Sequence, residues 1–248
     1  MSTDWLQRSE LLIKNEGIEK LKNANVFVVG LGGVGSFAAE FLARAGVGNL
    51  TIVDGDTVDI TNVNRQLPAL HSTVGKNKVE VVAERILDIN PEVHLIPINE
   101  FLSPERMDEM LENNKFDYVL DCIDSVSPKL ALIKACRRRK IKIVSSMGAG
   151  GKMDPSKVMV RDLSKTNNCY LAKQIRKRLK KEGITKGFRC VFSTEIQNED
   201  SLKLTDGSNF KKSFYGTISY MPALFGLNAA AEVINYLVKS QKKETGSN

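Results

Sequence analysis

The sequence predicts an α/β protein with a Rossmann-like, doubly wound, mainly parallel sheet and an appended C-terminal lobe. Two observations carry this prediction. Between residues 25 and 151, short apolar runs alternate with amphipathic helical stretches, which is typical of parallel strands joined by crossover helices. The first run, Val26–Val29, leads straight into Gly30-x-Gly32-x-x-Gly35 and a helical pattern, the order expected for a strand, a tight turn and a helix.

The elements of the first half are expected in a regular order. An amphipathic helical lead-in covers residues 4–24, with apolar positions at Leu11, Leu12, Ile18 and Leu21. Strands are then expected at 26–29, 50–54, 94–98, 118–122 and 141–145. Helices are expected from Phe37 to Gly46, at 78–89, from the N-cap Ser103 onward and at 128–140.

After Gly151 the rhythm changes. Short strands are expected at 158–160 and 190–193, a strongly basic helix at 173–181, a polar loop at 198–213 and an apolar closing helix at 226–238. We therefore divide the chain into a lead-in (1–24), a nucleotide-binding Rossmann-like unit (25–151) and an extension on the same sheet (152–248). The apolar stretch 218–238 contains Pro222, Asn228, Glu232 and Asn235, which favours a buried helix over a membrane span.

Composition places the protein in an ordinary soluble class. Apolar residues make up 42% of the 248, charged residues 26%, and the formal net charge of +7 favours polyanionic partners. The four cysteines (122, 136, 169 and 190) form no Cys-x-x-Cys pair, which argues against a structural zinc site or a disulfide framework. The first residues lack the apolar core of a signal peptide, so we expect a protein of the reducing cytoplasm.

The glycine turn predicts an anion site. A helix N-terminus carries unpaired N–H groups and the positive end of the helix dipole, and a backbone without Cβ atoms lets a phosphate approach closely. Asp54 closes the second strand, where the ribose hydroxyls of a nucleotide would be met. The alternative for Asp54 is a helix cap or turn residue.

Further polar residues follow the strand ends, where ligands of doubly wound sheets bind. They are Asp56 after the second strand, and Asp121 and Asp124 at the fourth. A single aspartate here suits Mg²⁺ bound together with substrate phosphates. The alternative for Asp124 is to cap the helix that begins after Ser125.

A loop beside the second strand, Asn62-Val-Asn-Arg65-Gln66, brings an amide and a guanidinium together, and Lys78 opens the next helix. Arg65 can fork onto phosphate oxygens and Lys78 can add a point charge. Each of these residues alone would more often be a solvated surface charge. Together with the glycine turn and the acids they favour an enzyme that breaks the phosphate chain of a nucleotide over one that transfers hydride.

These blocks, in this order and spacing, resemble the ubiquitin-activating-enzyme-like adenylating superfamily, whose bacterial members activate carboxylates as acyl adenylates. The matching blocks are Gly30–Ser36, Asp54-Gly-Asp56, Asn62–Gln66, Val74–Lys78 and Asp121-Cys-Ile-Asp124. Later blocks resemble the branch that dehydrates threonylcarbamoyladenosine in tRNA. Those blocks are Asp124–Lys129, Gly148–Gly151, Asp154-Pro155, Asp162–Thr166 and Val191–Glu195.

The resemblance implies residue roles. Arg8 would reach into the active site of the partner subunit of a homodimer, and Asp124 would hold Mg²⁺. The implied catalytic residues are Arg8, Arg65, Lys78 and Asp124. The implied ATP contacts are Gly30, Gly32, Gly33, Asp54, Asp56, Asn62, Arg65, Gln66, Lys78, Cys122, Ile123 and Asp124.

The resemblance also implies ATP and Mg²⁺ as cofactors, a tRNA carrying threonylcarbamoyladenosine as substrate, and no membrane partner. A monovalent cation (Na⁺ or K⁺) and a protein of the cysteine desulfurase sulfur-transfer system are further candidates, and Cys169 is more simply a passive thiol. A basic helix is the expected tRNA contact, through Lys173, Arg176, Lys177, Arg178, Lys180 and Lys181; Arg137–Lys140 is a second candidate surface.

Three other functions stay open at this point. The chain could adenylylate the C-terminal glycine of a ubiquitin-like sulfur carrier, although relatives of that kind often keep two Cys-x-x-Cys pairs that this sequence lacks. It could bind nucleotide and RNA without catalysis, or act as a nicotinamide-dependent oxidoreductase. The charged set around the phosphates disfavours the last.

Overall fold

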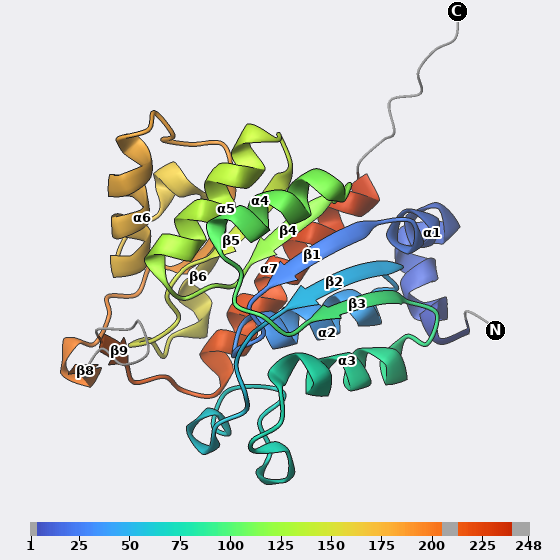
Figure 1. The fold of residues 1–248 in the computed structure, drawn as a ribbon, viewed down its shortest axis with the longest axis horizontal. Helices are drawn as coiled ribbons and strands as arrows, with labels where there is room; N and C mark the ends of the chain where they lie inside the picture. The colour runs from blue at the N-terminus through green and yellow to red at the C-terminus, as the bar shows by residue number, and fades with distance from the viewer. Residues whose placement is uncertain (1–3, 205–212, 240–248) are drawn as a thin grey trace, which may run out of the picture.

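The computed structural model describes residues 4–204 and 213–239. Its centre is a seven-stranded sheet in the order β3-β2-β1-β4-β5-β7-β6, in which only β6 runs antiparallel to its neighbour (Figure 1). The doubly wound, mainly parallel sheet is confirmed. Its strands are β1 (Asn25–Val29), β2 (Asn49–Val53), β3 (His94–Ile98), β4 (Tyr118–Asp121), β5 (Lys142–Ser146), β6 (Val158–Asp162) and β7 (Arg189–Ser193).

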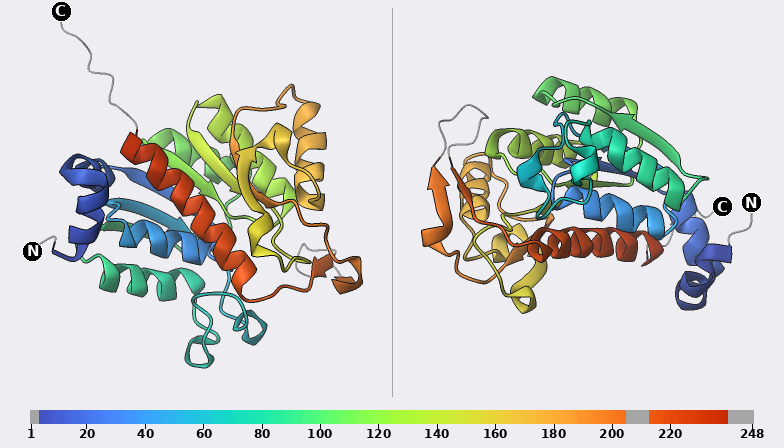
Figure 2. Two further views of the ribbon diagram at one scale, coloured as in Figure 1. Left: turned by 180° about the vertical axis from the view of Figure 1, so that it is seen from behind. Right: turned by 90° about the horizontal axis from the view of Figure 1, so that it is seen from below.

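Helices cover both faces of this sheet, as Figure 2 shows. The helices are α1 (Gln7–Lys22), α2 (Gly35–Arg44), α3 (Lys78–Ile89), α4 (Pro104–Asn113), α5 (Val126–Arg138), α6 (Tyr170–Lys180) and α7 (Tyr220–Lys239). Alternate residues of β1 serve the two layers: Val26 and Val28 pack with α2, α3 and α7, whereas Phe27 and Val29 pack with α4, α5 and α6. This two-sided burial is why the strand is apolar throughout.

Local signals placed several elements well. Helix α3 and strand β3 have the predicted bounds, and the Ser103 side chain caps α4 by accepting the Arg106 N–H (3.2 Å). The predicted start of the closing helix, Gly226, was wrong by six residues, because α7 begins at Tyr220. Pro222 lies in the first turn of this helix, where a backbone N–H has no helical acceptor, so proline is tolerated there.

Part of the polar stretch 198–213 was wrongly expected to be loop. Residues Leu202–Leu204 form β8, which pairs antiparallel with β9 (Ser213–Tyr215). Both strands are mostly exposed, so no alternation of buried residues marks them in the sequence. Residues 205–212 of the predicted loop lie outside the described part of the chain.

The lead-in helix is amphipathic only in its second half. Lys14 has a left-handed φ of 62° and interrupts α1. Ile18 and Leu21 beyond it are buried as predicted, whereas Leu11 and Leu12 before it are 77% and 83% exposed and do not join the core. The first half of α1 therefore presents apolar side chains to solvent.

Helix α7 is long and apolar enough to cross a membrane by length and composition. It lies instead along the sheet and packs on α2, with Gly226 so close to the backbone of Val34 that a Cβ would sit 2.3 Å from the Val34 carbonyl oxygen. This packing agrees with the buried core helix expected from its polar residues.

Candidate functional site

The glycine turn between β1 and α2 forms the floor of the candidate site. Gly30 has a φ of +91°, and a Cβ on it would lie 3.1 Å from the Cys122 carbonyl oxygen at the end of β4. A Cβ on Gly35 would lie 1.7 Å from the Gly30 carbonyl oxygen, so only glycine closes the turn. The motif therefore brings the ends of β1 and β4 together at the N-terminus of α2.

Asp54 follows β2 and ties that strand to the glycine turn. Its carboxylate accepts the N–H of Leu31 (2.6 Å) and of Asp56 (2.8 Å), which leaves further lone pairs on both oxygens. Burial raises the pKa of Asp54, and these two N–H groups oppose the rise, as does the nearby charge of Lys78. The carboxylate thus stands where a ribose hydroxyl could donate to it.

Lys78 opens α3 and points toward the same strand end. Its side chain is nearly buried, and its Nζ pairs with the exposed Asp56 carboxylate at 2.9 Å. The Lys78 backbone N–H also donates to the Asp56 carbonyl oxygen (3.0 Å). The structure therefore brings Lys78, Asp54 and Asp56 together.

The loop from Asn62 to Gln66 supplies the second cation. Asn62 is buried and its Oδ1 accepts the Asp59 N–H (3.3 Å), while its Nδ2 has no partner among residues 4–204 and 213–239. The Arg65 guanidinium donates to the Thr61 carbonyl oxygen and to Asn64 Oδ1, both at 2.8 Å. Burial lowers the pKa of Arg65, and the charges of Asp124 and Asp59 oppose this.

Asn64 is a residue that the sequence reasoning missed. Besides accepting from Arg65, it donates from Nδ2 to the Thr217 carbonyl oxygen (3.0 Å), in the segment that leads from β9 to α7. It thereby joins the Arg65 loop to the C-terminal lobe. Its place between Asn62 and Arg65 was the available signal, but a contact with Thr217 is too distant in the chain to read from spacing.

Asp124 is exposed beyond β4, and its negative charge raises the pKa of the Arg65 guanidinium against the effect of burial. It is not the cap of α5, because Ser125 occupies the N-cap position and no side chain caps that helix. Asp121, by contrast, was wrongly expected at the crevice. It is fully buried beneath it and pairs with Lys129 of α5 at 2.7 Å.

Three other predicted contacts border the glycine turn. Gln66 lies beside Gly32, and its Oε1 is a buried acceptor without a hydrogen-bond partner among the described residues. Ile123 donates its N–H to Asp121. Burial raises the pKa of Cys122 to about 12, so its thiol stays protonated and is no nucleophile at neutral pH.

Arg8 is the one predicted catalytic residue that the single chain keeps apart from the others. It is exposed on α1, which precedes the amino end of β1, whereas the glycine turn, Arg65, Lys78 and Asp124 gather at the carboxyl ends of the strands (Figure 1).

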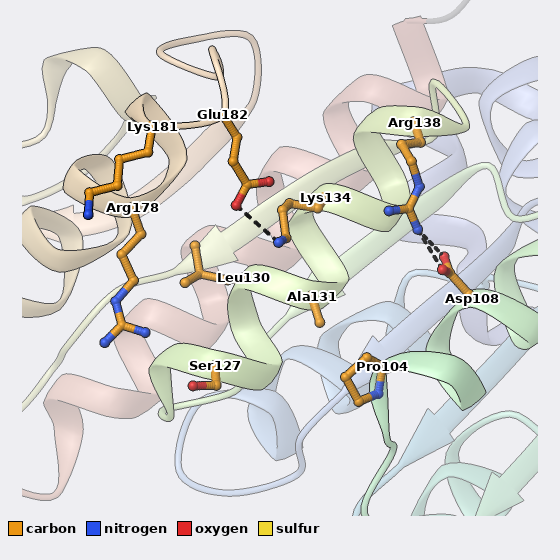
Figure 3. A pocket seen from close by; sticks show the side chains of 10 residues that line it. All are labelled: Pro104, Asp108, Ser127, Leu130, Ala131, Lys134, Arg138, Arg178, Lys181 and Glu182. Atoms are coloured by element: carbon orange, nitrogen blue, oxygen red, sulfur yellow. Dashed lines mark hydrogen bonds and ion pairs between the residues drawn. The ribbon is translucent and has the colours of Figure 1, made fainter.

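The basic helix α6 presents two rows of cations. Lys173, Lys177 and Lys180 form what we call the outer lysine row; they are exposed and have no partner in the described parts of the chain. Arg178 and Lys181 are among the residues that line a groove of about 590 Å³ between α4, α5 and α6 (Figure 3). Arg176 differs, because its guanidinium donates to the Thr166 carbonyl oxygen (2.8 Å) and is used within the chain.

Two of the four cations in the second basic run, Arg137–Lys140, are ion-paired. Arg138 and Arg139 both pair with Asp108 of α4, and Arg137 donates to the Gly187 carbonyl oxygen. Among the described residues, α6 therefore presents more cations without an ion-pair partner than this run does.

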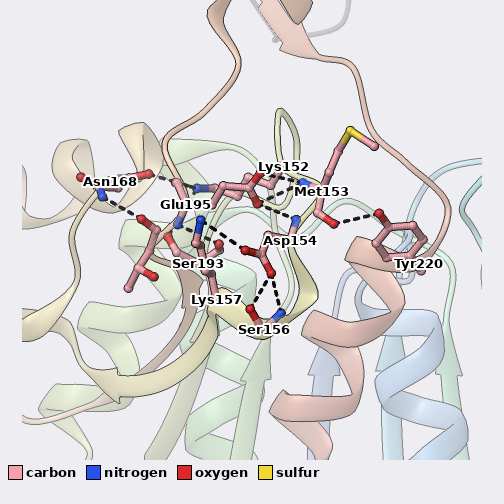
Figure 4. A network of polar contacts seen from close by, with 10 residues as sticks. Lys152, Met153, Asp154, Ser156, Lys157, Asn168, Ser193, Glu195 and Tyr220 are labelled. Carbon is pink, nitrogen blue, oxygen red and sulfur yellow. Dashed lines mark hydrogen bonds and ion pairs between the residues drawn. The ribbon is translucent and has the colours of Figure 1, made fainter.

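A second polar network shapes the loops after β5 and β7 (Figure 4). The buried Lys152 Nζ donates to the backbone carbonyl oxygens of Asn168 (3.1 Å), Ser193 (3.3 Å) and Glu195. The Glu195 carboxylate in turn accepts the N–H groups of Met153 and Asp154. This network fixes the lobe beside the crevice without contributing a free reactive group.

Within residues 4–204 and 213–239, no three or more His, Cys, Asp or Glu side chains gather in a way that could hold a metal by themselves. Besides Asp54 and Asp56, which lie with Lys78, the crevice has the exposed carboxylate of Asp124 near the Arg65 guanidinium. That set fits Mg²⁺, which keeps water ligands and is held by one or two carboxylates plus substrate phosphates.

Known proteins are similar to this chain over nearly its whole length. The family model described as "ThiF family" matches residues 6–248. The chain is 44% identical over 239 residues to the tRNA threonylcarbamoyladenosine dehydratase of Bacillus subtilis, covering 94% of each protein. It is also similar to the crystal structure of Escherichia coli tRNA N6-threonylcarbamoyladenosine dehydratase, TcdA, in complex with ATP, with a TM-score of 0.85, 40% identity and 95% and 96% of the two chains covered.

Similarity to another branch is shorter. The molybdopterin-synthase adenylyltransferase of Salmonella typhimurium is 39% identical over 155 residues, which cover 62% of this chain and 60% of that protein.

Proposed function

The chain belongs to the ThiF family, and from this premise we propose that it is an ATP-dependent dehydratase that cyclises threonylcarbamoyladenosine in tRNA. The observation that carries the proposal is the meeting of Arg65, Lys78 and Asp124 beside one glycine turn. The similarity to dehydratases spans almost the whole chain, whereas the similarity to the adenylyltransferase covers 62% of it. This favours the dehydratase over the activation of a sulfur-carrier glycine.

The reaction needs charge stabilisation more than acid–base chemistry. The threonyl carboxylate is ionised at neutral pH, so its oxygen can attack the α-phosphorus of ATP without a base. The bond to pyrophosphate breaks and an acyl adenylate forms. A carbamoyl nitrogen then attacks the activated acyl carbon, loses its proton and displaces AMP. The RNA loses the elements of one water, which ATP cleavage accounts for.

The residues at the crevice match this demand. We assign Arg65 and Lys78 to the charge that spreads over the phosphate oxygens, Asp54 to the ribose and Asn62 Nδ2 to the phosphate chain. Asp124 would hold Mg²⁺, which supplies Lewis-acid polarisation of the phosphates when bound. The glycine turn and the N-terminus of α2 orient the phosphates.

We further propose a homodimer in which Arg8 completes the partner's site. Two features support this: Arg8 stands apart from its own crevice, and the exposed Leu11 and Leu12 on the same half-helix are apolar side chains that a second subunit would bury. Without such a partner, Arg8 has no route to the phosphates.

The RNA would lie on α6. The outer lysine row together with Arg178 and Lys181 offers five cations for the phosphates of a folded RNA, and the paired run Arg137–Lys140 offers fewer. An RNA substrate, and cysteines that are all free thiols, agree with a cytoplasmic enzyme.

Two candidates from the family resemblance gain no support of their own. Cys169 is 4% exposed, which closes it to a sulfur-transfer protein in this conformation. Three backbone carbonyl oxygens that could bind a monovalent cation already accept hydrogen bonds from the Lys152 ammonium group.

The decisive experiment uses purified protein, ATP, Mg²⁺ and tRNA that carries threonylcarbamoyladenosine. We expect the modified nucleoside to lose the mass of one water, with AMP and pyrophosphate released in equal amounts. Pyrophosphate exchange stimulated only by the C-terminal glycine of a carrier protein would instead support the adenylyltransferase. ATP binding without any turnover would indicate a non-catalytic adaptor.

A further inference from the structure

A buried ion pair lies directly beneath the crevice. The Nζ of Lys129 donates to Asp121 Oδ2 (2.7 Å), to Ser145 Oγ (3.2 Å) and to the Ser146 carbonyl oxygen (2.9 Å). The side chains of Asp121 and Lys129 are both 0% exposed. Three elements, β4, α5 and β5, therefore meet at one salt bridge in the core.

Every polar atom of this pair is used. Ser145 donates from its Oγ to Asp121 Oδ2 (2.5 Å), and the other carboxylate oxygen accepts the Ile123 N–H (3.1 Å). A buried ion pair of this kind is weak evidence for stability, because apolar residues of similar size often serve the fold as well. Its presence calls for another reason.

The contacts of Asp121 lead to the nucleotide site. Cys122 donates its N–H to the carbonyl oxygen of Val29 (2.9 Å), the residue before the glycine turn. The Cys122 carbonyl oxygen packs against Gly30, where a Cβ would lie only 3.1 Å from it. The next residue, Ile123, is anchored to Asp121, and Asp124 follows. The backbone between the buried pair and the exposed Asp124 is thus held on both sides.

We propose that Asp121 is a positioning residue for the nucleotide site and that Lys129 balances its buried charge. Asp121 fixes the path of Cys122 and Ile123 by accepting the Ile123 N–H, and Lys129 is the counter-ion of that carboxylate. Asp124 and the glycine turn thereby keep their arrangement before ATP arrives. The role in ATP binding rests on the proposed function; the anchoring of the Ile123 amide does not.

Two double variants without the buried charges separate anchoring from stability. Asp121→Asn/Lys129→Met keeps an acceptor for the Ile123 N–H, whereas Asp121→Leu/Lys129→Met fills the same space with no acceptor. Both avoid leaving one buried charge alone, which would destabilise the fold. Their ATP affinities are measured by calorimetry with ATP and Mg²⁺, and their stabilities by thermal unfolding.

We expect Asp121→Asn/Lys129→Met to bind ATP within about threefold of the wild type, and Asp121→Leu/Lys129→Met to bind it at least about tenfold more weakly, as is typical when the support of a ligand residue is lost. Equal ATP affinities of the two variants, whether high or low, overturn the proposal. A wild type that binds no ATP contradicts the proposed function instead.

Hydrogen exchange on the wild type gives a test that requires no variant to fold. The Ile123 amide lies in a loop, yet its anchor predicts exchange on the order of a hundredfold slower than its intrinsic rate. Exchange at the intrinsic rate would overturn the proposal, whatever the enzyme does with ATP.

Discussion

Replacing Gly32 with alanine adds one methyl group to the glycine turn at a position where the fold has room for it. The added Cβ would lie 3.8 Å from Gln66 Nε2, an ordinary van der Waals contact, and Gly32 does not adopt the left-handed conformation. The substitution also removes backbone freedom from the unfolded chain, which typically stabilises by about 0.4–1 kcal/mol. We therefore expect Gly32→Ala to unfold no more easily than the wild type.

ATP binding should respond differently, because the methyl group occupies the space through which a phosphate reaches the backbone N–H groups. A tenfold loss of affinity corresponds to about 1.4 kcal/mol. At an ATP concentration of about 100 times the wild-type Kd, ligand binding stabilises the wild type by about 2.7 kcal/mol and would stabilise such a variant by only about 1.4 kcal/mol. Chemical unfolding with and without ATP and Mg²⁺ measures both quantities.

A matched control is Gly183→Ala, after α6. Gly183 has a φ of +76° and nothing within 4 Å of its missing Cβ, so alanine there adds backbone strain of about 1 kcal/mol without touching the crevice. This variant should be less stable yet keep the full ATP effect. If Gly32→Ala retains the wild-type stabilisation by ATP, the phosphates do not lie on this turn and the reasoning fails.

Three further predictions concern the charges. Asp124→Ala and Arg65→Ala should each abolish formation of the cyclic nucleoside while the melting temperature stays near that of the wild type; near-normal turnover would remove the residue from the site. Glutamine at the three positions of the outer lysine row should weaken tRNA binding. It should also reduce the slope of log K against log salt by about 0.7–0.9 for each RNA phosphate that the helix no longer neutralises. The control Arg138→Gln removes a charge that is already paired and should leave that slope nearly unchanged, so equal effects of the two changes would refute the assignment of the RNA to α6. Burial raises the pKa of Asp54 in the folded state, so the folded protein binds this proton more tightly, and the contribution of Asp54 to stability falls as the pH rises through the interval between its ordinary and its raised pKa. Asp54→Asn has no carboxylate to ionise and should not show this loss. As the pH rises through the interval, the free energy of unfolding of the variant should therefore increase relative to that of the wild type. A difference that does not change with pH would show that the pKa of Asp54 is not raised.

Much of the fold and the crevice could be predicted because the signals are local. Short apolar runs and helical spacing predicted the strands and helices, and a glycine turn followed by acids at strand ends indicated which residues would share one edge. The errors have the opposite character. The pairing of β8 with β9 and the burial of Asp121 against Lys129 both depend on partners from other elements, which charge and spacing along one segment do not reveal.

The charges at the crevice are held in place by the protein before any nucleotide is present. Lys78 is fixed by Asp56, and Arg65 by Asn64 and the Thr61 carbonyl oxygen. A side chain that is already ordered loses little further conformational entropy when a phosphate arrives. Little of its electrostatic attraction to the phosphate, or to the charge that develops during the reaction, is then offset by ordering. Since Lys78 is nearly buried and Asp56 is not, the lysine cannot withdraw into solvent, and the weaker, exposed partner is the one that a phosphate would displace. Asp56 can therefore keep Lys78 ordered until an anion displaces the carboxylate.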